Sequence, residues 1–331
     1  MSKSTTSRFL AASVAAAALL AATSTNAKTV VSFGYLNDPS HEAVMWALNN
    51  ERVSSDLIEI EATALDISAL IQATSARTYD VVQTAAMAIP RARDRGLDLE
   101  IIGTGLRYHE RGEGAGIWVP EDSDIESVAD LQGQRLGIYS IGSAGTTLVR
   151  IALSEVHGMT TETGGGDIEL VEMPAPSLPA ALATGRIDAA TLIHAQAFQA
   201  MQTGEFIPIT QTAQDLSERY GTRMVSAVLA GYSDNLEADP EIYEEFISLL
   251  RASVDYALDN RDEVFAEVGA ETDTDPEFFE AWFTRFSEFP VELTQDDIAA
   301  IDILWARSIE MGLLDDAPDA IDTIWPNAIH D

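Results

Sequence analysis

The organisation of the chain can be read from one stretch, Asp130-Leu-Gln-Gly-Gln-Arg-Leu-Gly-Ile-Tyr-Ser-Ile-Gly-Ser-Ala-Gly-Thr-Thr147. Its apolar residues at 135–139 predict a short strand, and the glycine and small hydroxyl residues at 140–145 predict a loop. From Thr146 onward the spacing predicts a helix that runs to about Leu153. A strand that turns directly into a helix leaves backbone N–H groups unpaired at the helix start, and these groups suit an anion. The alternative is an ordinary turn followed by a helix that Ser143 caps.

Strand and helix patterns alternate on both sides of this stretch. The first part predicts strands at 30–35, 57–62, 79–83 and 99–106 with helices at 42–50, 66–74 and 89–95 between them. This β-α-β order predicts a parallel sheet with helices on both faces. A second α/β unit follows, with strands at 115–119, 135–139, 168–173, 187–192 and 206–210, a surface turn at 164–166, and a strand at 224–230 that carries the chain back. After Asp239 the pattern is helical, at 240–260, 262–268, 276–286 and 294–311.

The first 27 residues are typical of a secretory signal peptide. They have a basic start, an apolar run at 9–22 and small residues before Ala27. We expect cleavage after Ala27 and a mature protein in the periplasm. The chain has no cysteine, so it forms no disulfide and lacks the residue that would carry a lipoprotein anchor. No stretch after the leader has the roughly 18 apolar residues that a membrane-spanning helix needs.

The charge of the chain is strongly negative. It has 54 Asp and Glu residues against 19 Lys and Arg, a formal net charge of −35. Such a chain repels nucleic acid and anionic lipid, so we expect neither as a partner. The sequence has no His-x-x-x-His or similar metal-ligand spacing, and we expect no metal.

Five segments resemble one known family. They are Tyr79-Asp-Val-Val82, Ser127-Val-Ala-Asp-Leu-Gln-Gly-Gln-Arg-Leu-Gly-Ile138, Gly142-Ser-Ala-Gly-Thr146, Leu182-Ala-Thr-Gly-Arg-Ile-Asp-Ala-Ala190 and Leu236-Glu-Ala-Asp-Pro-Glu-Ile242. These segments mark a resemblance that covers nearly all of the mature chain. The chain resembles the periplasmic substrate-binding proteins of ABC importers for taurine, alkanesulfonates, nitrate and thiamine precursors. The chain departs from many of these proteins at Ile193-His194-Ala195, where they carry Trp, an acidic residue and Pro.

The resemblance implies a two-lobe α/β periplasmic-binding-protein fold (type II). Each lobe would be a mostly parallel sheet flanked by helices, with a hinge between the lobes. Lobe one would comprise 28–114 plus 218–331, and lobe two 115–217. The implied function is to capture a small anionic or zwitterionic solute, such as a sulfonate or taurine, and to deliver it to the transmembrane subunits of an ABC permease. We expect a monomer without a cofactor.

Seven residues at strand ends and helix starts are candidate ligand contacts: His41, Thr84, Arg107, Ser143, Gly145, Thr146 and His194. An arginine such as Arg107 can pair with a carboxylate or sulfonate through two parallel hydrogen bonds. Glycine at 145 would let a ligand approach the backbone. Each residue also has a structural alternative, namely a helix cap for Thr84 and Ser143, a surface ion pair for Arg107, and a solvent-exposed or capping histidine for His41.

Three other functions remain open. The solute can be aromatic or heterocyclic, such as a thiamine precursor, or the protein can report a ligand to a membrane receptor. Proteins of this fold also include a pyridoxal-phosphate enzyme, which needs a lysine for its Schiff base. The only lysine after the leader is Lys28, at the start of the mature chain. We therefore expect that the chain is not an enzyme.

Overall fold

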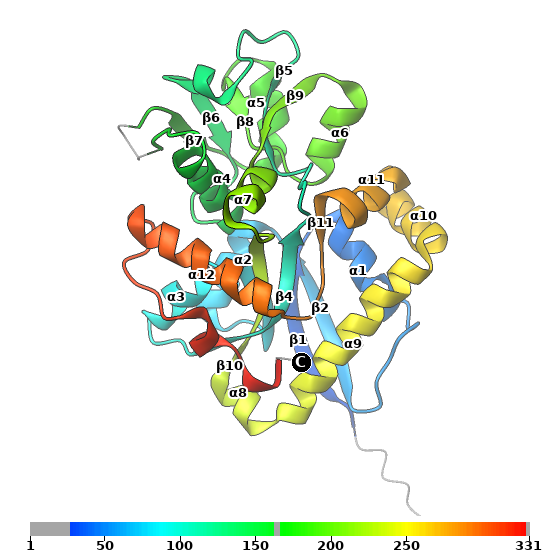
Figure 1. Ribbon diagram of the computed structural model, residues 1–331. Helices are drawn as coiled ribbons and strands as arrows, with labels where there is room; N and C mark the ends of the chain where they lie inside the picture. Colours follow the sequence, from blue (N-terminus) through cyan, green and yellow to red (C-terminus); the bar gives the residue numbers. More distant parts are fainter. Residues whose placement is uncertain (1–26, 162–165, 329–331) are drawn as a thin grey trace, which may run out of the picture.

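The computed structural model describes residues 27–161 and 166–328, which form two α/β lobes one above the other (Figure 1). The predicted signal peptide lies outside the described residues except for Ala27, and so does the predicted turn at 164–166 except for Gly166. We call the lobe built on the six-stranded sheet lobe one and that built on the five-stranded sheet lobe two. The domain boundaries expected from the sequence remain a proposal.

The sheet of lobe one has the strand order β11-β4-β10-β3-β1-β2. Its strands are β1 (Thr29–Leu36), β2 (Ile58–Leu65), β3 (Val81–Ala85), β4 (Leu99–Tyr108), β10 (Val225–Tyr232) and β11 (Ser287–Glu288). β1 pairs in parallel with β2 and β3, whereas β10 lies antiparallel between β3 and β4. The sheet is therefore mixed but mostly parallel, as predicted, because β1, β2, β3 and β4 run in one direction and β10 and β11 run against them. The chain returns from lobe two through β10, and it enters the sheet from the end at which β3 and β4 finish.

Helices cover both faces of this sheet (Figure 1). They are α1 (Pro39–Asn49), α2 (Ile67–Ala76), α3 (Ala88–Arg93), α8 (Ser233–Ala238), α9 (Pro240–Asp259), α10 (Arg261–Thr272), α11 (Pro276–Ala281) and α12 (Gln295–Glu310). The helix predicted at 276–286 is α-helical only to Ala281. It continues as one π-helical turn, η3 (Trp282–Phe286), a feature that is frequent at functional sites.

The sheet of lobe two has the order β7-β6-β8-β5-β9. Its elements are β5 (Gly116–Pro120), β6 (Arg135–Ile138), α4 (Ala144–Glu155), β7 (Glu169–Glu172), α5 (Leu178–Ala183), β8 (Ala189–Ala190), α6 (Ala195–Thr203), β9 (Phe206–Gln211) and α7 (Thr212–Tyr220). β6 is parallel to β7 and β8, and β5 is antiparallel to β8 and β9. The sequence analysis missed α7 because its residues are mostly polar and give little apolar periodicity.

The cores of the two lobes meet. The main apolar cluster fills lobe one and extends to Leu148 on α4 and Phe198 on α6, which belong to lobe two. Lobe two has further clusters around Leu136 and around Trp118. Burying each large apolar side chain contributes about 1.5–3 kcal/mol, so this shared cluster stabilises the packing of the lobes against each other.

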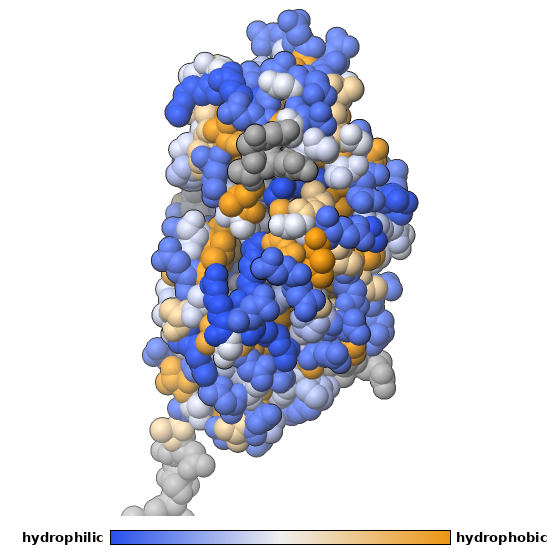
Figure 2. Space-filling view, turned by 90° about the vertical axis from the view of Figure 1, so that its left-hand side faces the viewer, coloured by the Kyte–Doolittle hydropathy of each residue, from blue (hydrophilic) through white to orange (hydrophobic). Residues whose placement is uncertain are grey.

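The surface is mostly hydrophilic on the face shown in Figure 2, and its hydrophobic residues gather mainly around the middle of that face. Across residues 27–161 and 166–328, every helix is too short or too polar to cross a membrane.

Candidate functional site

A pocket lies between the two lobes, where strand ends of both sheets meet. Lobe one lines it with the ends of β1, β3 and β4 and the start of β10, and lobe two with the start of α4 and residues 191–194. Its cavity volume is about 120 Å³, which leaves room for several water molecules or a small ligand. The segment 114–116, where the chain crosses from β4 of lobe one to β5 of lobe two, also lines it. A bend at the crossings would therefore change the width of the pocket.

The walls of the pocket are largely apolar. Leu36, Ile67, Leu70, Leu106 and Leu148 are among the lining residues. Within the described chain, the lining contains no Lys, Arg, Asp or Glu side chain. The polar groups are hydroxyls, the Gln83 amide and the imidazole of His194. Such a lining favours a ligand with an apolar body and few polar groups.

Asp38 and His194 form an ion pair at one end of this pocket. Asp38 follows β1 in lobe one and caps α1, whereas His194 follows β8 in lobe two and precedes α6. Nδ1 of His194 lies 2.9 Å from Oδ2 of Asp38, and both side chains are largely buried. Burial lowers the pKa of His194, but the carboxylate of Asp38 raises it, with a net rise. Burial raises the pKa of Asp38, and His194 and His41 lower it, so that the pKa lies well below its usual value.

Gln83 fixes the protonation of the second histidine, His41. Oε1 of Gln83 accepts a hydrogen bond from the backbone N–H of Leu36 at 2.9 Å. Its amide nitrogen must therefore be the donor to the carbonyl of Gly105 at 3.0 Å and to Nε2 of His41 at 2.8 Å. His41 accepts at Nε2, so it is neutral and carries its proton on Nδ1. Burial lowers the pKa of His41, which agrees with this assignment.

The backbone of His194 is in a conformation that few non-glycine residues adopt. Its φ is +46° and its ψ is −114°. Such a conformation costs on the order of 1–3 kcal/mol and persists where the surroundings hold it. Here the ring of Trp282, from the π-helical turn η3, meets the imidazole edge to face with the ring centres 6.2 Å apart. The strain and the packing together direct the imidazole toward Asp38.

Two tyrosine hydroxyls lie at the start of α4. A Cβ built on Gly145 would overlap the hydroxyl of Tyr139 and lie 3.5 Å from that of Tyr108. Burial raises the pKa of both tyrosines, so both hydroxyls stay protonated and can donate hydrogen bonds. Oγ1 of Thr146 is buried and has no hydrogen-bond partner among the described residues. This end of the pocket can therefore bind an acceptor group of a ligand.

The seven predicted contacts fall into three groups. Thr84, Ser143, Gly145 and His194 line the pocket. His41 lies behind His194, with the two rings stacked 6.2 Å apart, and Thr146 lies buried one turn into α4. The Ser143 side chain accepts a hydrogen bond from the backbone N–H of Thr146. It therefore caps the helix, which is the structural alternative that the sequence also allowed for Ser143.

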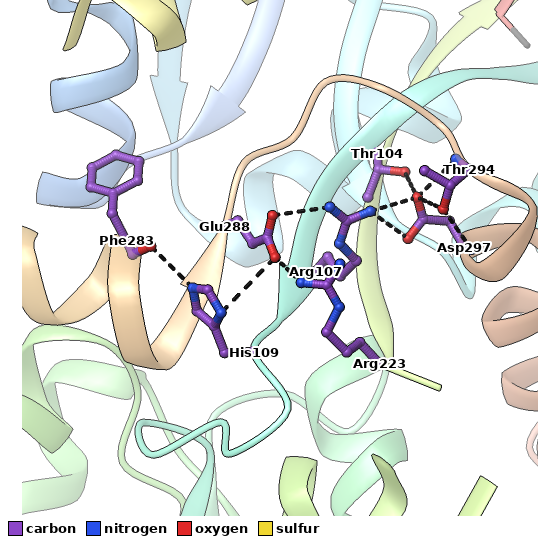
Figure 3. Close-up of polar contacts among 8 residues, drawn as sticks. All are labelled: Thr104, Arg107, His109, Arg223, Phe283, Glu288, Thr294 and Asp297. Atoms are coloured by element: carbon purple, nitrogen blue, oxygen red, sulfur yellow. Dashed lines mark hydrogen bonds and ion pairs between the residues drawn. The ribbon is translucent and has the colours of Figure 1, made fainter. Parts of the chain in front are cut away.

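Arg107, the remaining predicted contact, lies outside the pocket lining. Its guanidinium binds both carboxylate oxygens of Asp297, at 3.0 and 2.9 Å, and one oxygen of Glu288 at 2.9 Å (Figure 3). Glu288 also pairs with Arg223, beside the second crossing, and lies 4.0 Å from His109, beside the first. The guanidinium of Arg107 is paired within the protein instead, with Nη1 bound to both oxygens of Asp297 and Nη2 bound to Glu288. This network ties β4, β11 and α12 together beside both crossings.

Four residues of the site were missed by the sequence analysis: Asp38, Gln83, Tyr108 and Tyr139. Asp38 and Gln83 had a recognisable signal, because each lies at the carboxyl end of a predicted strand in lobe one. Tyr139 ends the strand in the quoted stretch, and Tyr108 follows the strand predicted at 99–106. Their aromatic character is equally compatible with a core position, so nothing in the sequence favours the pocket.

The chain matches one protein-family model, and its structure is similar to several solved structures. A model of the menaquinone biosynthesis family matches residues 31–310. No curated protein sequence matches the chain. The structure is similar to the alkanesulfonate-binding protein SsuA of Xanthomonas axonopodis pv. citri bound to MOPS, with a TM-score of 0.73, 17% identity and coverage of 90% of this chain and 99% of that one.

Two further structures are similar. The periplasmic aliphatic sulphonate-binding protein SsuA of Escherichia coli has a TM-score of 0.71, 15% identity and coverage of 91% of this chain and 99% of that one. A protein of Archaeoglobus fulgidus has a TM-score of 0.70, 21% identity and coverage of 86% and 98%. At these identities the similarity shows the fold alone. It confirms the predicted two-lobe periplasmic-binding-protein fold and, at the level of fold, the resemblance to sulfonate-binding proteins.

The family match also corrects one expectation. From the absence of a suitable lysine we expected that the chain is not an enzyme. The matching family is one of menaquinone biosynthesis, which is enzyme-related, so that expectation is wrong as a general exclusion. The argument from lysine bears only on Schiff-base chemistry, and acid–base chemistry by a histidine needs no lysine.

Proposed function

The chain belongs to the menaquinone biosynthesis family, and from that premise we propose that it binds a small organic acid with an apolar body in the pocket between its lobes. The observation that carries this proposal is the distribution of polar groups in the pocket. The lining is mainly apolar, and its polar groups are hydroxyls, the Gln83 amide and the imidazole of His194. A ligand with one acceptor group can accept hydrogen bonds from the hydroxyls, and its apolar remainder can contact the apolar walls.

The acidic group of the ligand binds at the start of α4. The backbone N–H groups of Ala144 and Gly145 are in the first helical turn and have no recorded acceptor within the described residues. They add to the donors Tyr108 and Tyr139, and the positive end of the helix dipole favours a negative charge there. A carboxylate or a sulfonate fits this set of donors.

The same lining argues against a zwitterion such as taurine. The ammonium group of taurine would need a carboxylate or several acceptors, and the lining contains no Asp or Glu side chain among the described residues. Asp38, which lies beside the lining residue His194, already pairs with it. The proposed ligand is therefore a monoanion with an alkyl or aryl body.

We further propose that the protein acts outside the cytoplasm and delivers its ligand to an ABC permease. This is supported by the leader-like sequence before Lys28 and by the name of the similar Escherichia coli structure, a periplasmic aliphatic sulphonate-binding protein.

A second candidate function is acid–base catalysis on the bound acid. It is favoured by the Asp38–His194 pair, because a carboxylate that holds Nδ1 of an imidazole directs the other ring nitrogen, Nε2, toward a proton to be moved. His194 lines the pocket, and no hydrogen bond of its Nε2 is recorded within residues 27–161 and 166–328. The family match is consistent with such chemistry.

The test is a thermal-shift and calorimetry panel of matched compounds. It contains hexanoate, hexanesulfonate, 2-naphthoate, the neutral amide of each carboxylate, and taurine. An acid at 100 times its Kd should stabilise the protein by about 2.7 kcal/mol, and its amide should bind more weakly. Tyr108→Phe should weaken binding of the acids, whereas Tyr256→Phe, a control on α9 outside the lining, should not.

The outcomes separate the two candidates. Binding of taurine but of none of the apolar-bodied acids would contradict the proposed ligand class. Mass spectrometry of the bound acid recovered after incubation distinguishes capture from catalysis. An unchanged mass supports capture, and a changed product that His194→Gln no longer forms supports acid–base chemistry.

A further inference from the structure

We propose that Asp38 and His194 form a proton-dependent latch between the two lobes, so that closing the pocket takes up a proton. The role of the latch in retaining a ligand rests on the proposed function, but the latch itself involves only residues of this chain. It would make closure of the lobes stronger in acidic than in alkaline surroundings.

The ion pair between Asp38 and His194 joins the two lobes. Asp38 is fixed in lobe one, because its Oδ1 accepts hydrogen bonds from the backbone N–H and the hydroxyl of Ser40, at 3.0 and 2.5 Å. Its Oδ2 has one recorded partner within the described chain, Nδ1 of His194 at 2.9 Å. When the lobes separate, Oδ2 must exchange His194 for water.

The lobes are also in contact around this pair. Phe198 on α6 packs edge to face on Phe278 on α11, with ring centres 5.8 Å apart. Elsewhere the guanidinium of Arg91, on α3, donates a hydrogen bond to the carbonyl of Gly142 in lobe two, at 2.9 Å. An arginine stays charged at all ordinary pH values, so this second contact does not depend on pH. The dependence on pH comes from the Asp38–His194 pair.

The group that changes its charge is His194. The groups that act on His194 are Asp38 and, stacked on it, His41. His41 is neutral because Gln83 donates to it, and Asp38 is ionised. The next charged group is Glu42, which interacts electrostatically with Asp38 and accepts a hydrogen bond from Tyr35. The ring of Trp282, which also packs on His194, is uncharged. The start of α6 disfavours a positive charge at position 194, and the nearby carboxylate of Asp38 outweighs it.

The sign of the effect follows from the pKa of His194 in the two arrangements. In the closed arrangement Asp38 raises this pKa. In an open arrangement, where the imidazole faces water, the pKa returns toward its ordinary value of about 6.5. Closure is therefore most favourable below the open-state pKa and is lost as pH rises through the closed-state pKa. Between these two values the closing constant changes by up to about tenfold per pH unit, the limit for one proton.

The experiment exploits the absence of cysteine from the chain. Gln199→Cys on α6 and Glu267→Cys on α10 introduce one exposed labelling site in each lobe. Spin labels at these two sites report the distance between the lobes by pulsed electron paramagnetic resonance. The distance is measured without any ligand from pH 5 to pH 9, in the labelled protein and in the same protein carrying His194→Gln or Asp38→Asn. Circular dichroism verifies that each variant is folded.

We expect the fraction of closed molecules to fall as pH rises in the parent protein and to be lower and independent of pH in His194→Gln. In Asp38→Asn the fall should disappear and reverse, because burial without the carboxylate lowers the pKa of His194 and closure then releases a proton. The matched control is His157→Gln. His157 also makes a 2.9 Å ion pair, with Asp215, but both residues belong to lobe two, so this variant should titrate like the parent. A closed fraction that does not change with pH in the parent, or that changes equally in His194→Gln, would overturn the latch. Because no ligand is present, failure of the proposed ligand class leaves this result unaffected.

Discussion

The side chain of Tyr139 packs directly against Gly145 at the start of α4. The sequence analysis expected Gly145 to let a ligand approach the backbone. The structure gives a different reason for the glycine, since the hydroxyl of Tyr139 occupies the space that a Cβ at position 145 would need. Gly145 therefore allows Tyr139, rather than the ligand alone, to approach the helix start, and it holds a hydrogen-bond donor at the acid-binding end of the pocket.

This fit predicts the effect of Gly145→Ala. The new methyl group would overlap the Tyr139 hydroxyl and should destabilise the protein by about 1–3 kcal/mol, as overpacking usually does. In Tyr139→Phe the hydroxyl is gone, and the methyl group would then lie 3.2 Å from the ring carbon Cζ, a distance that a small shift accommodates. We expect the double variant to recover most of the loss in urea unfolding. Strictly additive effects of the two substitutions would contradict this fit.

Two helical elements start with the same local motif in different surroundings. At α12, Thr294 and Asp297 form a reciprocal capping box, and Asp297 is 1% exposed and also binds Arg107 (Figure 3). At η1 (Val128–Leu131), Ser127 and Asp130 form the same box on the surface. The sequence pattern is alike, but only the box of α12 anchors the charge network beside the interlobe crossings.

Asp297→Ala should therefore cost far more stability than Asp130→Ala. Removing Asp297 leaves the guanidinium of Arg107 buried without one of its two carboxylates, and breaking a buried pair in this way typically costs about 3–5 kcal/mol. Asp130→Ala removes only an exposed cap and serves as the matched control. Urea denaturation of the two variants measures the difference, and comparable losses would show that Asp297 acts as a cap alone.

At the scale of the whole molecule, the net charge of −35 opposes compactness. Acidic residues outnumber basic ones by 54 to 19, and most recorded ion pairs involve at least one partly exposed partner, such as Arg77–Asp234. Such exposed pairs offset little of the general repulsion between carboxylates. Dissolved salt screens that repulsion over a distance of about 8–10 Å near physiological ionic strength.

The melting temperature should therefore rise when NaCl is increased from about 10 mM to about 150 mM, over which the screening length falls from about 30 Å to about 8 Å. Each kcal/mol of relieved repulsion raises the midpoint by roughly 2–4 °C in a chain of this size class. Equal concentrations of KCl and tetramethylammonium chloride serve as controls for binding of a particular cation. A midpoint that stays constant or falls in all three salts would contradict the prediction.

The features that the sequence determined by itself are local. The periodicity of apolar residues predicted β1, β4, α9 and α12 to within a few residues of their observed bounds, because helix and strand patterns depend on neighbours in the chain. It also predicted that Thr84, Ser143 and His194 would lie at strand ends and helix starts, where ligands bind in open α/β sheets. The resemblance to the binding-protein fold rests on the same local segments.

The tertiary structure decided which of these residues meet. Asp38 and His194 come from different lobes, and Arg107 finds Asp297 and Glu288 far along the chain. It also decided that β10 inserts antiparallel between β3 and β4. Ion pairs and strand neighbours depend on distances of a few ångströms between segments that are remote in sequence, and local periodicity carries no information about those distances. A charged residue at a strand end is therefore visible in the sequence, whereas its partner is fixed only when the lobes pack.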